Sequence, residues 1–187
     1  MGVDRIHLFG AAGSGTTTMG RALAQHLHFP HFDTDDYFWL PTNPPYHEVR
    51  DAAERQTLLA RDLQSREKWV LSGSLCGWGD AMIPFFDLTV FLLVPTDTRL
   101  SRLAAREEQR FGEALQPDGP MYDHHRQFMQ WAADYDDGGL DMRSRMRHEQ
   151  RLENLPGPVL RLEGDGSVRQ WLDRILAELN RLQSHHH

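Results

Sequence analysis

Alternating apolar and polar stretches along the chain predict short strands separated by amphipathic helices. The apolar runs at 68–74 and 88–94 are continuous, which is typical of strands buried on both faces of a parallel sheet. Three further short runs predict strands at 5–9, at the segment that ends with Asp33, and at 158–162.

Apolar residues recur at helical spacing between these runs. The pattern predicts helices over 16–27, 48–66, 96–111, 123–136 and 141–154, and a last helix opened by a capping box at Ser167 and Gln170. The aromatic and proline-rich segment 34–47 is expected to be a loop, and glycines and prolines predict a mobile loop at 112–119. Strands that alternate with helices favour a three-layer α/β fold with helices on both faces of a parallel sheet.

Composition adds a domain count and a class of partner. With 187 residues, of which 40% are hydrophobic, we expect one domain over residues 1–184, and residues 185–187 resemble the remnant of a purification tag. The 27 acidic and 20 basic side chains give a net charge of −7, which argues against a broad surface for nucleic acid or anionic lipid. Small molecules are therefore the expected partners, and any local basic cluster indicates a specific anion site.

Cysteine content and hydropathy predict where the protein works. Cys76 is the single cysteine, so one chain can form neither a disulfide framework nor a four-thiolate zinc site. The longest apolar run, 88–95, is shorter than the roughly 18 residues of a membrane span, and no signal-peptide pattern opens the chain. We expect a cytoplasmic protein, and a monomer, because no long apolar helix face is left over.

A glycine-rich segment, GAAGSGTT at 10–17, follows the first predicted strand and precedes a predicted helix. Its spacing matches the phosphate-binding motif G-x-x-x-x-G-K-[ST], except that Thr16 stands where the motif has lysine. Such a loop binds phosphate through backbone N–H groups and the positive end of the helix. We therefore predict a nucleotide-binding site formed by Gly10, Gly13, Ser14, Gly15, Thr16, Thr17 and Thr18. The alternative is a glycine turn that only packs the helix on the sheet.

The missing lysine requires another source of positive charge. Losing one such donor costs on the order of 3 kcal/mol of transition-state stabilisation, and the chain's single lysine, Lys68, lies just before a different strand. Arginines recur three or four residues apart on one predicted helix, at Arg99, Arg102, Arg106 and Arg110. Guanidinium groups bind phosphate oxygens in a bidentate manner, so we interpret this face as a phosphate clamp in which Arg99 binds the nucleotide. The alternative is a solvated helix face, with Glu107 and Glu108 pairing locally.

An acidic cluster, FDTDD at 32–36, ends the second predicted strand. Crowded carboxylates near a triphosphate repel one another unless a cation lies among them, which favours a magnesium site. The alternative is a group of turn or helix-capping aspartates, and Asp36 fits that role.

An acceptor pocket is predicted beside this cluster. Aromatic residues gather in loops that follow strand ends, where open α/β sheets bind ligands. The candidate acceptor-binding residues are Asp35, Trp39, Arg50, Arg55, Gly73, Ser74 and Trp78. In the alternative interpretation the rings close the core, and Arg50 or Arg55 pairs with Glu48 or Glu54.

Taken together, these motifs resemble those of the nucleoside monophosphate kinase and shikimate kinase group of P-loop phosphotransferases. Besides the glycine loop, the resemblance is carried by FDTDD, VLSGS, VPTDTRLSRLAARE, MRSRMRHE and LRLEGDGSV, which together span nearly the whole chain. It implies a P-loop NTPase fold with a parallel sheet of about five strands, an acceptor-binding segment at about 36–66 and a helical lid at about 107–147.

The resemblance also implies roles for single residues. Thr17 would bind Mg²⁺ directly, Asp33 would hold it through water, and Asp35 would hold or deprotonate the acceptor hydroxyl. Four arginines would close over the phosphates as catalytic residues: Arg102, Arg106, Arg143 and Arg147.

Two functions follow from these observations. The first is a magnesium-dependent phosphotransferase that moves the γ-phosphoryl group of ATP to a nucleotide-like or small ring acceptor. The second, favoured by the absent lysine, is a nucleotide-binding protein with weak or no kinase activity that acts as a sensor or scaffold.

Overall fold

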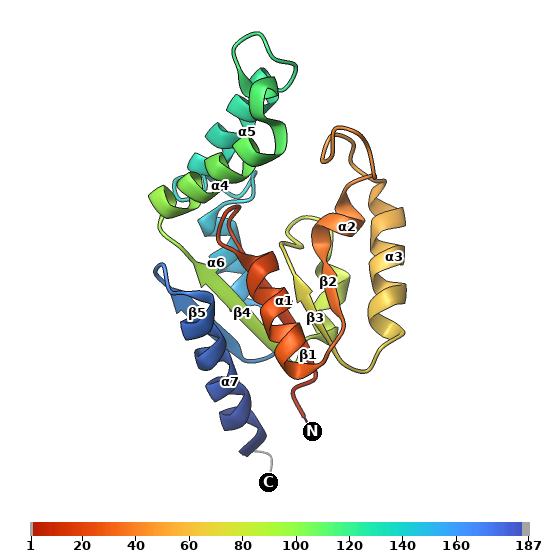
Figure 1. Ribbon diagram of the computed structural model, residues 1–187. Helices are drawn as coiled ribbons and strands as arrows, with labels where there is room; N and C mark the ends of the chain where they lie inside the picture. The colour runs from red at the N-terminus through yellow and green to blue at the C-terminus, as the bar shows by residue number, and fades with distance from the viewer. Residues whose placement is uncertain (1, 185–187) are drawn as a thin grey trace.

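A five-stranded parallel sheet forms the centre of the structure, a computed structural model that describes residues 2–184 (Figure 1). Its strands are β1 (Arg5–Gly10), β2 (His31–Asp33), β3 (Trp69–Ser72), β4 (Leu88–Leu93) and β5 (Val159–Glu163). They lie in the order β2-β3-β1-β4-β5, and each pairs with its neighbours in parallel. The predicted α/β fold is confirmed.

Helices connect the strands and cover both faces of the sheet (Figure 1). They are α1 (Thr16–Leu27), α2 (Thr34–Phe38), α3 (Ala52–Gln64), α4 (Thr96–Phe111), α5 (Tyr122–Ala133), α6 (Arg145–Glu153) and α7 (Val168–Ser184), with 3-10 turns η1 (Asp80–Phe85) and η2 (Gly112–Leu115). Within residues 2–184, none of these helices has the length and apolarity needed to cross a lipid bilayer.

Side chains that alternate along each strand separate the core into two layers. On β1, Ile6 and Leu8 pack against α1 and α7. Phe9 points to the other face, where it packs against Leu152 of α6, and Leu71 of β3 packs there against α3. The strands are therefore apolar on both faces, which explains why the sequence shows them as continuous runs.

The strand register brings three site segments to one edge of the sheet. Leu8 pairs with Ser72, Asp33 pairs with the same Ser72, and Gly10 pairs with Leu92. The carboxyl ends of β1, β2 and β3 therefore lie together. Helices α4 and α5 and turn η2, which we call the helical arm (residues 96–133), rise beyond this edge (Figure 1).

One segment folds differently from its prediction. Residues 34–38, expected to lie in a loop, form the short helix α2, because the Asp33 side chain accepts a hydrogen bond from the backbone N–H of Asp35 and caps it. The predicted capping box of the last helix is confirmed, since Ser167 Oγ accepts from the Gln170 N–H and Gln170 Oε1 accepts from the Ser167 N–H.

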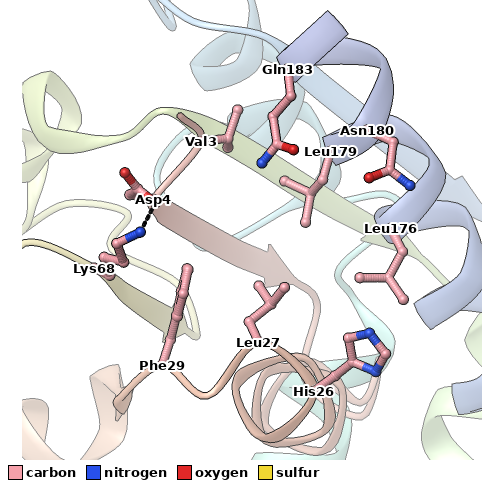
Figure 2. A pocket seen from close by; sticks show the side chains of 10 residues that line it. All are labelled: Val3, Asp4, His26, Leu27, Phe29, Lys68, Leu176, Leu179, Asn180 and Gln183. Atoms are coloured by element: carbon pink, nitrogen blue, oxygen red, sulfur yellow. Dashed lines mark ion pairs between the residues drawn. The ribbon is translucent and has the colours of Figure 1, made fainter. Parts of the chain in front are cut away.

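The chain's single lysine lies before the amino end of β3, where Figure 2 shows it close to Asp4 and Phe29. Lys68 precedes β3 and pairs with Asp4 before β1, with 3.0 Å between Nζ and Oδ1. Its ammonium group also lies 5.6 Å from the ring centre of Phe29. The phosphate loop follows the other end of β1, and a strand of this length spans roughly 20 Å, so Lys68 does not replace the loop lysine.

Asp87 holds the amino end of β1, because its Oδ2 accepts hydrogen bonds from the backbone N–H groups of Asp4 and Arg5. We predict that Asp87→Ala lowers the free energy of unfolding by about 2 kcal/mol, since hydrogen bonds to a charged acceptor are lost. Thermal unfolding should show a midpoint about 4–8 °C lower. The control Asp173→Ala removes an exposed carboxylate from α7, and an equal loss in that variant would contradict the assignment.

Candidate active site

The loop between β1 and α1, residues 10–17, has the tight backbone of a phosphate loop. Gly13 and Gly15 have φ angles of 80° and 87°, a region that favours glycine. A Cβ atom at Gly10 would lie 2.5 Å from the Leu92 carbonyl oxygen, and one at Gly13 would lie 2.5 Å from the Arg99 carbonyl oxygen. Close packing therefore requires glycine at both positions. A glycine turn that only connects β1 to α1 would not need this crowding.

Hydroxyl side chains surround the start of α1. Ser14 is buried, and its Oγ has no hydrogen-bond partner among the described residues. Thr16 and Thr17 are half-buried in the first turn of α1, and Thr18 is exposed. An orphaned hydroxyl beside free helix N–H groups suits an anion.

A cavity of about 500 Å³ opens beside this loop. Its lining joins the loop to the turn that follows β5, and it comprises Ser14, Gly15, Thr18, Met19, Arg102, Asp165, Gly166, Ser167, Val168, Gln170 and Trp171. Arg102 approaches the loop closely, with Nη1 3.9 Å from the place of a Cβ on Gly15. Three of the predicted loop residues and one predicted arginine thus line a cavity within the size range of small-molecule sites.

Arg99 departs from its predicted place. Its side chain is completely buried, and all five of its N–H donors point to protein acceptors. These acceptors are the carbonyl oxygens of Ala12, Val94 and Ala132, the Thr96 hydroxyl and the Asp136 carboxylate. With no donor left for a phosphate, Arg99 holds the phosphate loop, the end of β4 and the end of α5 together.

The outer arginines of α4 partly neutralise a buried acid. Glu107 is buried, and its Oε1 lies 3.3 Å from Arg106 Nη2 and 3.8 Å from Arg110 Nη1. Arg106 also lies 6.0 Å from the ring centre of Phe128 in α5. The local pairing considered as an alternative is therefore present, and Arg106 still keeps an exposed side chain.

Asp33 ends β2 as a buried carboxylate with two protein partners. Oδ1 accepts from the Asp35 N–H at 3.0 Å, and Oδ2 accepts from the Ser72 hydroxyl at 3.0 Å. The capping role considered for this cluster is thus filled by Asp33. A carboxylate offers about four lone-pair sites, so two remain for a water molecule on a metal ion.

Asp35, in α2, is a carboxylate whose pKa responds to nearby arginines. Its side chain reaches solvent, but partial desolvation raises its pKa, and the negative charge of Asp33 raises it further. The positive charges of Arg143 and Arg106 act in the opposite direction. Asp35 therefore lies within electrostatic reach of two of the predicted catalytic arginines, one from the helical arm and one from the segment before α6.

Arg143 lies just before α6 and Arg147 lies in the first turn of α6. The guanidinium of Arg143 lies 4.6 Å from the ring centre of Trp131, and its buried Nε has no hydrogen-bond partner in the described part of the chain. Nη2 of Arg147 lies 3.1 Å from the place of a Cβ on Gly77. Trp131 was not among the predicted site residues, because an aromatic residue on a helix gives no sign of the cation it will contact.

The predicted acceptor side contains one uncommitted arginine. Arg55 of α3 lies 4.4 Å from the ring centre of Phe38 and 5.2 Å from that of Trp78. Its Nε is buried without a partner, and no carboxylate of residues 2–184 forms an ion pair with it. Arg50, in contrast, is used by the fold.

Nε of Arg50 donates to the Tyr37 carbonyl and Nη1 pairs with Glu54 at 2.8 Å, which is one of the pairings considered above. Trp39 is half-buried and packs edge-on against Phe38 and Tyr46. These contacts form the wall of the predicted acceptor segment.

The loop after β3, residues 73–78, completes this side. Gly73 has a φ of 103°, and a Cβ there would lie 1.9 Å from Thr34 Oγ1, so only glycine fits. Ser74 and Trp78 are buried, and the Trp78 indole N–H donates to the Ser74 carbonyl oxygen at 3.3 Å. The 73–78 loop is therefore fixed from within.

These residues fit ATP and Mg²⁺. The crowded glycines and the orphaned Ser14 hydroxyl suit phosphate, and Thr17 with Asp33 offers oxygen ligands on one edge. Among residues 2–184, no cluster of three or more His, Cys, Asp or Glu side chains could hold a metal by itself. Mg²⁺ commonly binds through few protein oxygens together with substrate phosphates and water.

Comparisons with known proteins extend this picture. The family described as AAA domain matches residues 6–116. The chain is 45% identical over 175 residues to the uncharacterised protein YqaC of Bacillus subtilis (strain 168), with 94% of this chain and 97% of that protein covered. It is 31% identical over 121 residues to a cytidylate kinase of Haloarcula marismortui, covering 58% of this chain and 62% of that enzyme. The chain thus spans less than two thirds of that kinase.

Solved structures confirm the fold. A shikimate kinase from Acinetobacter baumannii in complex with shikimate matches 96% of this chain and 94% of its own, at a TM-score of 0.57 and 18% identity. A gluconokinase from Sinorhizobium meliloti 1021 matches 98% of this chain and 95% of its own, at a TM-score of 0.55 and 16% identity. At these identities the likeness concerns the fold alone.

The two inner arginines of α4 should respond differently to substitution. We predict that Arg99→Met lowers the free energy of unfolding by about 3 kcal/mol or more, because it leaves the Asp136 carboxylate and buried carbonyl groups unpaired. Arg102→Ala should leave the unfolding midpoint nearly unchanged, since the side chain is exposed. That variant should instead weaken ATP binding measured by titration calorimetry, and unchanged binding would remove Arg102 from the site.

Proposed function

We propose that this chain is a P-loop phosphotransferase. It belongs to the AAA domain family and to the same family as YqaC of Bacillus subtilis. It would move the γ-phosphoryl group of ATP to a small acceptor with the help of Mg²⁺. The observation that carries the proposal is the position of Asp35 in α2, just after β2 ends at the same edge of the sheet as the phosphate loop, within electrostatic reach of Arg106 and Arg143.

In this proposal the phosphate loop binds the ATP phosphates through its backbone N–H groups, with the nucleoside in the cavity that Arg102 lines. Thr17 would hold Mg²⁺ directly, and Asp33 would hold it through water. When bound, Mg²⁺ neutralises charge on the phosphate oxygens. Residues 1–184 would act as one domain, in which the segment 36–66 binds the acceptor and the segment 107–147 forms the lid.

The arginines would supply the charge that the loop lacks. Arg106 and Arg143 lie within electrostatic reach of Asp35, and Arg147 lies beside Gly77 in the 73–78 loop. Guanidinium groups placed on the transferred phosphoryl group stabilise its developing charge. Thr16 then needs only to complete the first turn of α1.

Asp35 would act on the acceptor. A carboxylate with a raised pKa binds a proton more readily, so Asp35 is suited to hold the acceptor hydroxyl and to take its proton during transfer. The positive charges of Arg143 and Arg106 favour its ionised form. The protein would otherwise contribute position and charge.

The acceptor would be a nucleotide-like or small ring compound that carries an acidic group. Aromatic walls from Trp39 and Trp78 suit a ring, and Arg55 has both an unpartnered Nε and no carboxylate partner in the described chain. The cytidylate kinases among the relatives are named for a nucleotide, cytidylate. Arg50 would support the pocket wall through Glu54.

Adjacent aspartates provide a direct test of the mechanism. We predict that Asp35→Asn reduces phosphoryl transfer from ATP by about 10² or more, because the base is lost. Asp36→Asn, one residue further on the same helix, should keep most activity. Transfer would be followed with radiolabelled ATP and a panel of nucleoside monophosphates and small hydroxy acids. Equal losses in the two variants would contradict the role given to Asp35.

Asp35→Asn should stabilise the fold even though it lowers activity. Because the pKa of Asp35 is higher in the folded protein than in the unfolded chain, ionisation of this group destabilises the fold as pH rises above about 4. Asp35→Asn should therefore raise the unfolding midpoint of the nucleotide-free protein at pH 7, and the gain should shrink towards pH 4. A midpoint that falls at pH 7 would contradict this sign.

A second candidate function is a nucleotide-binding sensor or scaffold with weak or no transfer. The observation that favours it is Thr16 in place of lysine. Thr16→Lys distinguishes the two functions in the transfer assay above. A large gain in transfer would indicate that the native loop is catalytically weak and favour the sensor, whereas no gain would mean that the arginines already supply the charge.

A further inference from the structure

Four buried side chains contact one another in series: Ser74, His148, Tyr135 and Arg99. We call them the polar network. His148 of α6 is completely buried, and both of its ring nitrogens have partners. Nδ1 shares a hydrogen bond of 2.8 Å with the Tyr135 hydroxyl, and Nε2 shares one of 3.1 Å with the Ser74 hydroxyl. The proposed mechanism uses neither His148 nor Tyr135.

One end of the polar network reaches the phosphate loop. The ring centre of Tyr135 lies 4.9 Å from the guanidinium carbon of Arg99. Nη1 of Arg99 donates to the carbonyl oxygen of Ala12, which lies within the phosphate loop, at 3.4 Å. The loop that would hold the triphosphate is therefore linked to His148 through two buried side chains.

The other end reaches the 73–78 loop. Ser74 Oγ accepts a hydrogen bond from the Cys76 N–H at 3.3 Å, and the Ser74 carbonyl oxygen accepts from the Trp78 indole N–H at 3.3 Å. The ring of Trp78 in turn lies beside Arg55. The other end of the polar network therefore contacts the backbone and the side chains that would face the acceptor.

His148 is held in its neutral form. Burial lowers its pKa well below the ordinary value, and the positive charges of Arg143, Arg151 and Arg147 lower it further. Edge-on contacts with the rings of Phe9, at 4.9 Å, and Phe91, at 5.8 Å, fix its plane. A neutral imidazole donates from one ring nitrogen and accepts at the other, so one of its two hydroxyl neighbours accepts a hydrogen bond and the other donates one.

We propose that Tyr135, His148 and Ser74 are positioning residues that couple the 73–78 loop to the phosphate loop through Arg99. Apolar side chains of similar volume would fill the same space equally well, but they would not fix the distance between two loops that carry different substrates. The inference rests on the proposed function, because it concerns how nucleotide binding orders the acceptor side.

Amide hydrogen exchange at Cys76 tests the coupling, since this N–H donates to Ser74 Oγ. The probe is Mg²⁺ with a β,γ-imido analogue of ATP, which does not transfer its phosphoryl group. In the unmodified protein we expect the analogue to slow exchange at Cys76 by about fivefold or more, the lower end of typical coupling between sites. Tyr135→Phe should bind the analogue with similar affinity and lose most of this slowing.

Two controls separate coupling from a general loss of stability. Tyr122→Phe removes a hydroxyl from the helical arm that takes no part in the polar network, and Asp87→Ala weakens the opposite edge of the sheet. Both should keep the nucleotide effect at Cys76.

The outcomes distinguish this inference from the proposed function. If the analogue binds but does not change exchange at Cys76, or if Tyr135→Phe keeps the full slowing, the positioning role is wrong and the phosphotransferase proposal stands. If the unmodified protein does not bind the analogue at millimolar concentration, both are wrong.

Discussion

The buried guanidinium of Arg99 is the constraint on which the site depends. A guanidinium stays charged in proteins, so enclosing it requires a partner for every donor. The partners found here come from the phosphate loop, from the turn after β4 and from the end of α5. The position of the helical arm relative to the phosphate loop is thus fixed by one side chain, and a shift of either would leave a buried charge unpaired.

From this fixed point, the remaining positive charge is distributed around the mouth of the site. Arg102 lies beside Gly15, while Arg106 and Arg143 act on Asp35. A loop with lysine carries its charge inside the phosphate cradle. In the proposed mechanism this chain brings the charge from outside, on segments that also bear the lid, so closure of the lid and neutralisation of the phosphates would be one event.

Much of the fold could be predicted from the sequence, because its signals are local. Continuous apolar runs identified the buried strands, and the helix predicted over 96–111 has those bounds in α4. Helix α2 was missed because aromatic residues and prolines nearby indicated a loop, whereas one capping hydrogen bond from Asp33 decides that short segment. Spacing placed Arg99 and Arg106 on related faces of one helix but could not tell which would turn inward.

Long-range partners account for the rest. The acceptors of Arg99 at Ala12 and Asp136 are far from it in the sequence. His148 lay inside a stretch that was noticed for its arginines, and its link to Ser74 crosses 74 positions of the chain. No local pattern carries such contacts. Asp35 could be singled out because strand ends and carboxylates are both visible in the sequence, whereas its raised pKa depends on the fold.

Thermal unfolding of the unmodified protein with ATP, first with Mg²⁺ and then with a chelator, tests most directly whether a phosphate loop without lysine binds nucleotide. A ligand at 100 times its dissociation constant stabilises by about 2.7 kcal/mol, which should raise the midpoint by several degrees for a chain of this size. The account predicts such a rise with Mg²⁺ and a smaller one with chelator. An unchanged midpoint at millimolar ATP would contradict nucleotide binding. It would indicate that the glycine loop is a turn that only packs α1 on the sheet.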